Sequence, residues 1–200
     1  SLNGHHPPGR EASAVADAID FEQDRRVRVS RAQEVGVQGV GLAALQGCRF
    51  AGASRIVAVD NQAWKLELAR KLGATAVVNS ADDDAVMKVL EMTGGGVDYA
   101  FECIGLPPTV QQAGGMIRRG GTALLVGVVP IGQTVDLMPA DITLQEKRVV
   151  GSMMGSNRFR VDMPRYVDFY LAGRLNLDEM ITARIGLDGV NAAFEAMRKG

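Results

Sequence analysis

Histidine and cysteine are both rare in this 200-residue chain, which has two of each. Cys48 and Cys103 are too few for the disulfide framework of a small secreted domain or for a four-thiolate zinc site. The adjacent His5 and His6 are interpreted as a solvated chain end with no third ligand. The N-terminus lacks the basic then apolar order of a signal peptide. We therefore expect a reducing, cytoplasmic setting and no metal site built from these residues.

An excess of one charge is also lacking, since 22 basic residues face 23 acidic ones. A net charge of -1 gives no general attraction to nucleic acid or to an anionic membrane. The longest uncharged stretch, residues 120–135, contains glycine and proline and is too short to span a bilayer. Neither nucleic acid nor a membrane is expected as a partner.

Glycine, in contrast, is abundant, with 24 residues that fall largely where apolar runs end. Between them, β-branched runs alternate with stretches of helical periodicity. The expected strands are 55–60, 75–79, 97–104, 122–126, 149–153 and a short one at 180–185. The expected helices are 63–72, one capped by Asp82-Asp83-Asp84 and running to Thr93, 107–117 with Gly120-Gly121 as its stop, 162–172 and 188–198. Continuous apolar strands joined by helices predict an α/β fold, a doubly wound parallel sheet covered on both faces.

Three parts of the chain are distinguished by these patterns. Residues 35–153 form the predicted sheet domain, and residues 154–200 change pattern and read as a separate C-terminal unit. No element is assigned to residues 1–34, for which a disordered end is one interpretation.

A glycine turn provides the clearest indication of a site. Gly36-Val-Gln-Gly39-Val-Gly41 leads into the helical run that begins at Leu42. Such a turn directs backbone N–H groups and a helix N-terminus at a pyrophosphate. Gln38 stands where the dinucleotide fingerprint has its second glycine, so we expect it to weaken binding. Asp60 ends the following strand, where its carboxylate can accept bonds from both hydroxyls of an adenosine ribose.

Two other interpretations of this turn remain open. The first is a parallel-sheet protein with a tight glycine turn and no nucleotide. The second is a methyltransferase, because Glu34-Val-Gly36 is similar to the acidic start of a loop that binds S-adenosylmethionine, with Asp60 as the ribose acid.

From Gly36 to Gly200 the sequence resembles the zinc-dependent alcohol dehydrogenases of the medium-chain dehydrogenase/reductase superfamily, in their class III-like branch. The motifs that carry the resemblance are Gly39-Val-Gly-Leu42, Val59-Asp60, Lys65-Leu-Glu-Leu-Ala-Arg-Lys-Leu-Gly-Ala-Thr75, Thr93-Gly-Gly-Gly-Val-Asp98, Phe101-Glu-Cys-Ile-Gly105 and Gly121 through Val126-Gly-Val128. The resemblance implies a Rossmann domain that binds NAD at the carboxyl ends of its strands.

The resemblance also implies a role for individual positions. The glycine turn would follow the pyrophosphate, and Asp60 would bind the adenosine ribose, with Lys65 adding a contact on that side. Ile104 and Gly105 would lie under the cofactor, and the backbone of residues 126–128 would approach the nicotinamide carboxamide. The implied cofactor contacts are Gly36, Gln38, Gly39, Val40, Gly41, Asp60, Lys65, Ile104, Gly105, Val126, Gly127 and Val128.

In this family a zinc ion polarises the substrate alcohol, and the resemblance implies that its ligands belong before Gly36, where they are missing. We therefore expect a fragment with no catalytic residues of its own. The expected function is the cofactor-binding part of an oxidoreductase that transfers hydride between an alcohol, or an aldehyde adduct, and NAD. A stand-alone nucleotide-binding module without turnover is the alternative.

Two further expectations follow from the resemblance. Ser30-Arg-Ala-Gln-Glu-Val35 replaces the apolar first strand, so Arg31 and Glu34 would each need a partner if buried there. The edge strand 149–153 would pair with its copy across a two-fold axis to give a homodimer.

Overall fold

The computed structural model describes the backbone of residues 32–35 and 39–199, and side chains for residues 39–197. The elements are β1 (Ala32–Val35), α2 (Gly39–Phe50), β2 (Ile56–Asp60), α3 (Ala63–Leu72), β3 (Ala76–Asn79), α4 (Ala85–Thr93), β4 (Val97–Glu102), α5 (Pro107–Met116), β5 (Ile117–Leu125), α6 (Pro139–Leu144), β6 (Arg148–Gly151), α7 (Phe159–Leu171) and α8 (Val190–Lys199), with short 3₁₀ turns at Met153–Ser156, Asp178–Met180 and Leu187–Gly189.

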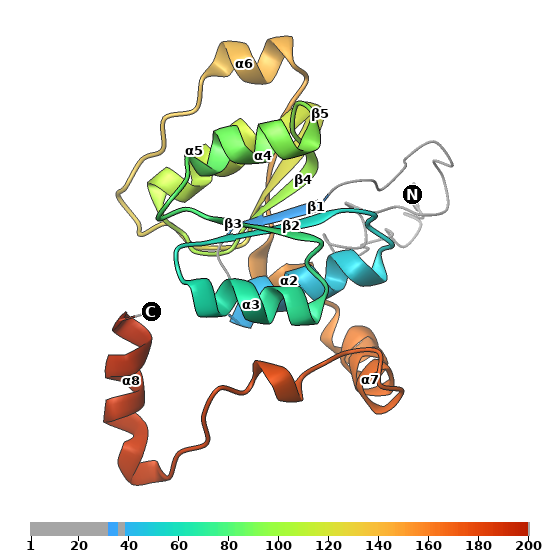
Figure 1. The fold of residues 1–200 in the computed structure, drawn as a ribbon, viewed down its shortest axis with the longest axis vertical. Helices are drawn as coiled ribbons and strands as arrows, with labels where there is room; N and C mark the ends of the chain where they lie inside the picture. The colour runs from blue at the N-terminus through green and yellow to red at the C-terminus, as the bar shows by residue number, and fades with distance from the viewer. Residues whose placement is uncertain (1–31, 36–38, 200) are drawn as a thin grey trace, which may run out of the picture.

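Six parallel strands form one sheet in the order β3-β2-β1-β4-β5-β6. Helices α2 and α3 lie on one face of the sheet and α4 and α5 on the other (Figure 1). All five residues of β2 are buried, as expected for a strand covered on both sides. The predicted doubly wound α/β fold is confirmed.

Helix boundaries in the first half follow local signals that were visible in the sequence. Asp84 caps α4 because its Oδ1 accepts hydrogen bonds from the N–H groups of Val86 and Met87. Gly73 ends α3 in the left-handed conformation, with φ of 119°, and its N–H bonds back to the last turn. The predictions of helices at 63–72 and up to Thr93 are confirmed.

The prediction that Gly120-Gly121 ends a helix is wrong. Helix α5 ends at Met116, and both glycines lie inside β5. Ile117 pairs with Val97 and Thr122 pairs with Tyr99, so the intervening residues of β5 bulge out of register. Gly120 takes a φ of +70° within that bulge, which glycine adopts at little cost.

The prediction of a short strand at 180–185 is also wrong. In the described part of the chain, residues 181–186 carry no regular element and pair with no strand. Met180 instead faces α2, where its Sδ accepts a hydrogen bond of 3.4 Å from Gln46 Nε2. A β-branched run becomes a strand only where a neighbour can satisfy its backbone groups. The final strand, expected at 149–153, is present as β6 and lies at the sheet edge as predicted.

The chain beyond β6 contacts the sheet domain through α2. The buried side chain of Gln46 exchanges hydrogen bonds with the backbone of Asn176. The rings of Phe50 and Phe169 stack with centroids 5.0 Å apart, and the Arg174 guanidinium lies over both rings. No described helix combines the length and apolar character needed to cross a membrane.

Candidate functional site

The sheet changes direction of winding between β1 and β4, its two central strands. From β1 the chain continues outward through β2 and β3, whereas β4, β5 and β6 extend the other way. Such a switch point opens a crevice at the carboxyl ends of the strands, where α/β proteins bind ligands. Most of the predicted site residues lie at this edge: at the end of β2, the start of α2, and after β4 and β5. Gly36 and Gln38 lie outside the described residues.

Asp60 forms the end of β2 and is 7% exposed. Its Oδ1 accepts a hydrogen bond of 2.8 Å from the N–H of Gln62, and its backbone carbonyl accepts one of 3.0 Å from Ser80. The bond from Gln62 fixes the carboxylate, and the bond from Ser80 fixes the backbone at the strand end. Lys65, in the first turn of α3, is equally buried, and its ammonium lies 5.6 Å from the centroid of the Trp64 ring.

Helix α2 begins at Gly39, so the unpaired N–H groups of its first turn lie at the same edge. The partial positive charge of a helix N-terminus favours an anionic group there. Gly41 is buried, whereas Gly39 and Val40 are exposed. The exposed start of the helix can therefore receive a phosphate while its second turn packs on the sheet.

Gly105 and Gly127 bring the ends of β4 and β5 into direct backbone contact. A Cβ atom built on Gly127 would lie 2.2 Å from the nitrogen of Gly105. One built on Gly105 would lie 2.5 Å from the carbonyl oxygen of Val128, and Gly105 has a φ of +83°. Only glycine fits at either position without displacing backbone. Ile104 and Val128 flank this contact and are exposed, 41% and 74%, so they offer an apolar surface at the crevice.

Glu102, the last residue of β4, was not among the predicted site residues. It is fully buried, and its Oε1 accepts hydrogen bonds of 2.8 Å from the N–H groups of Ile104 and Gly105. The Thr109 hydroxyl of α5 lies 2.8 Å from the same oxygen. One signal could have identified it, because an acidic residue that closes a buried apolar strand needs nearby donors.

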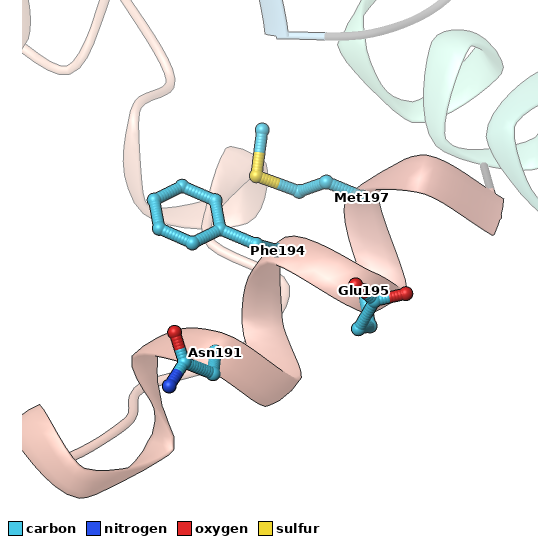
Figure 2. A pocket seen from close by; sticks show the side chains of 4 residues that line it. All are labelled: Asn191, Phe194, Glu195 and Met197. Carbon is cyan, nitrogen blue, oxygen red and sulfur yellow. The ribbon is translucent and has the colours of Figure 1, made fainter.

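One hollow among the described residues lies away from this edge, beside α8. It measures about 450 Å³ and is lined by Asn191, Phe194, Glu195 and Met197. Phe194 and Met197 extend to the same side of the helix (Figure 2). All of its lining residues belong to α8, so it is an open helix face, not an enclosed site. A smaller cavity of about 170 Å³ lies between α5, α6 and β6.

Within residues 39–197, no three His, Cys, Asp or Glu side chains come together in a way that could hold a metal ion. Cys48 lies in α2 and Cys103 directly after β4. His5 and His6 lie outside the described residues. The described side chains therefore do not fit a zinc centre.

Comparison with known proteins places these features in a family. The family model of zinc-binding dehydrogenases matches residues 39–172. A probable S-(hydroxymethyl)glutathione dehydrogenase of Schizosaccharomyces pombe is 40% identical over 94% of this chain and 48% of its own length. A class-3 alcohol dehydrogenase of Myxine glutinosa is 39% identical over 82% of this chain and 43% of its own length.

Among solved structures, benzyl alcohol dehydrogenase of Acinetobacter calcoaceticus superposes with a TM-score of 0.84 and 30% identity. The match covers 100% of this chain and 56% of that one. The chain thus spans about half the length of the relatives that it matches.

Proposed function

Because this chain belongs to the zinc-binding dehydrogenase family, we propose that its sheet domain, residues 35–153, binds NAD across the crevice between β1 and β4. The observation that carries the proposal is Asp60, a buried carboxylate held at the end of β2, the strand that pairs with β1. A carboxylate in that position can accept bonds from both hydroxyls of the adenosine ribose.

We propose the remaining contacts along the same edge, as the resemblance implies. We assign the pyrophosphate to the glycine turn and to the start of α2, which includes Gly39 and Val40. Lys65 would add a positive charge on the adenosine side. Ile104 and Gly105 would lie beneath the nicotinamide half of the cofactor. The backbone of Val126, Gly127 and Val128 would meet the carboxamide.

As a function, we propose the cofactor-binding part of an oxidoreductase that acts on an alcohol or an aldehyde adduct. Bound NAD would accept or return hydride, while the residues of this chain hold and orient it. The described side chains do not fit a zinc site, so no step of the reaction is assigned to a metal here. We propose that this chain alone is inactive and that residues 154–200 belong to the catalytic domain of the whole enzyme.

Two alternatives remain distinguishable from this function. A nucleotide-binding module without turnover would share the whole crevice and differ only in lacking a catalytic partner. A methyltransferase would use the same turn and Asp60 for S-adenosylmethionine, but family membership does not favour it.

We further propose a homodimer formed through β6, and a cytoplasmic location. Strand β6 lies at the open edge of the sheet, and Val149 and Val150 are 37% and 41% exposed. An exposed edge offers unpaired backbone groups to a second copy.

Calorimetric titration of the purified chain with NAD, NADP and S-adenosylmethionine tests the proposed function. We expect NAD to bind and S-adenosylmethionine not to bind. Preferential binding of S-adenosylmethionine would favour the methyltransferase, and no binding of any nucleotide would contradict the cofactor role. Zinc measured by mass spectrometry on the same sample would show whether this chain retains a metal.

A further inference from the structure

Glu102 accepts the N–H groups of four residues that border the nicotinamide half of the crevice. Its side chain accepts those of Ile104 and Gly105 through Oε1. Its backbone carbonyl accepts those of Val126 and Gly127 at 2.8 and 2.9 Å. One residue thus ties together the ends of both strands on that side of the switch point.

The carboxylate also fits the glycine contact between the two strands. A Cβ on Gly127 would lie 2.7 Å from Oε2 of Glu102, so the missing side chain makes room for this oxygen. Oε2 is buried and has no hydrogen-bond partner within the described residues. Leaving such an acceptor unsatisfied destabilises a fold, so its presence at a crevice points to a role beyond packing.

We propose that Glu102 is a positioning residue for the nicotinamide end of the cofactor. Its Oε1 holds the Ile104-Gly105 turn, and its backbone carbonyl holds the residues after β5 beside that turn, so that the backbone of both segments is fixed before the cofactor arrives. A preorganised surface binds more tightly than one that must be ordered during binding. This inference rests on the proposed function, because it needs NAD to occupy the crevice.

Two variants separate the negative charge of Glu102 from its hydrogen-bond acceptor. Glu102→Gln keeps an oxygen that can accept from Ile104, Gly105 and Thr109, whereas Glu102→Ala removes it. The matched control is Thr93→Val. The buried Thr93 hydroxyl accepts the N–H of Gly96 at 3.0 Å and donates to Val89, so it stabilises the opposite end of β4.

The test compares calorimetric affinities for NAD and ADP-ribose, which differ only in the nicotinamide. We expect Glu102→Ala to weaken NAD binding roughly tenfold while ADP-ribose binding changes by less than about twofold. Glu102→Gln should recover most of the NAD affinity. Thr93→Val should lower the unfolding midpoint without changing the affinity for NAD relative to that for ADP-ribose. Without ligand, hydrogen exchange at Ile104 and Gly105 should accelerate in Glu102→Ala.

Several results would overturn the proposal. Equal losses of NAD and ADP-ribose affinity, or no loss in Glu102→Ala, would leave Glu102 a structural residue only and the proposed function intact. Unchanged exchange at Ile104 and Gly105 would show that Glu102 does not hold the turn. A wild-type chain that fails to bind NAD would contradict the proposed function and this role together.

Discussion

The side-chain amide of Gln46 and the backbone of Asn176 exchange two hydrogen bonds, although 130 residues separate them. Nε2 of Gln46 donates to the carbonyl of Asn176 at 2.9 Å, and Oε1 accepts the Asn176 N–H at 2.8 Å. Gln46 is 2% exposed, so its side chain is shielded from water, whereas Asn176 is half-buried. Helix α2 therefore begins at the crevice and also holds the C-terminal segment through Gln46.

We predict that Gln46→Leu loosens this attachment. The substitution keeps the bulk but removes both hydrogen bonds to the Asn176 backbone. Because Asn176 is half-buried and water can replace part of each bond, we expect a loss of about 0.5 to 1.5 kcal/mol for each bond. Limited proteolysis should cut within 172–186 faster than in the wild type, and the urea midpoint should fall. Gln46→Glu is the matched variant, because it retains the acceptor for the Asn176 N–H. Equal cleavage in wild type and Gln46→Leu would contradict the prediction.

Asp60→Ala should weaken NAD binding by roughly tenfold to a hundredfold, because hydrogen bonds to a charged group contribute ~1.5 to 3 kcal/mol. Its carboxylate should also repel the 2′-phosphate of NADP, so the wild type should prefer NAD. Calorimetry with both cofactors at one salt concentration measures this. The exposed Asp136, beside α6, provides the control Asp136→Ala. An NADP affinity equal to or higher than the NAD affinity would contradict the role proposed for Asp60.

Alanine at two glycines should have opposite effects on stability. Gly127→Ala places a methyl group 2.2 Å from the Gly105 nitrogen, and overpacking of this kind costs at least ~1 to 3 kcal/mol. Gly47, inside α2, has nothing within 4 Å of an added Cβ. Gly47→Ala should therefore raise the free energy of unfolding by about 0.5 to 1 kcal/mol. Urea unfolding of both variants measures the difference, and a stable Gly127→Ala would show that the two strand ends can separate.

The edge strand provides a test of the proposed dimer. Val150→Lys places a charge on the exposed edge and, across a two-fold axis, opposite its own copy. We expect sedimentation to show a dimer for the wild type and a monomer for the variant. Ile131→Lys, at a fully exposed loop residue, should leave the dimer unchanged. A wild type that remains monomeric at high micromolar concentration would count against the interface.

Gln38→Gly should tighten NAD binding, as expected from the glycine fingerprint alone. In the fingerprint, the second glycine leaves room for the pyrophosphate, whereas a glutamine at that sequence position adds a side chain, and a compensating neutral hydrogen bond contributes only ~0.5 to 1.5 kcal/mol. Titration of both proteins at one salt concentration measures the change. A weaker complex in Gln38→Gly would mean that the glutamine contacts the phosphates.

Local signals predicted the elements whose boundaries depend on a few neighbouring residues. Asp84 before α4 and Gly73 after α3 act within one turn, so the sequence alone identified them. The prediction for Gly120-Gly121 was wrong because a glycine pair can either stop a helix or allow a bulge in a strand. The pairing of Ile117 with Val97 places these glycines in a strand.

Among the site residues, Asp60 was predictable because it ends an apolar run at a fixed distance from a glycine motif. The contact between Gly105 and Gly127, and the bonds of Glu102, depend on how two strands meet in space. No spacing along the chain encodes that distance.

The sheet order has a consequence for how the chain can fold. In the described sheet, the four-residue strand β1 joins the pair β2 and β3 to the group β4, β5 and β6. Val35 of β1 pairs with Val59 on one side and with Glu102, 67 residues further along (35 to 102), on the other. During synthesis, β1 can pair with β2 early, but β4 is synthesised much later. One edge of β1 therefore stays unpaired until β4 has been synthesised. Long-range pairing of this kind slows folding and exposes the folding intermediate to aggregation.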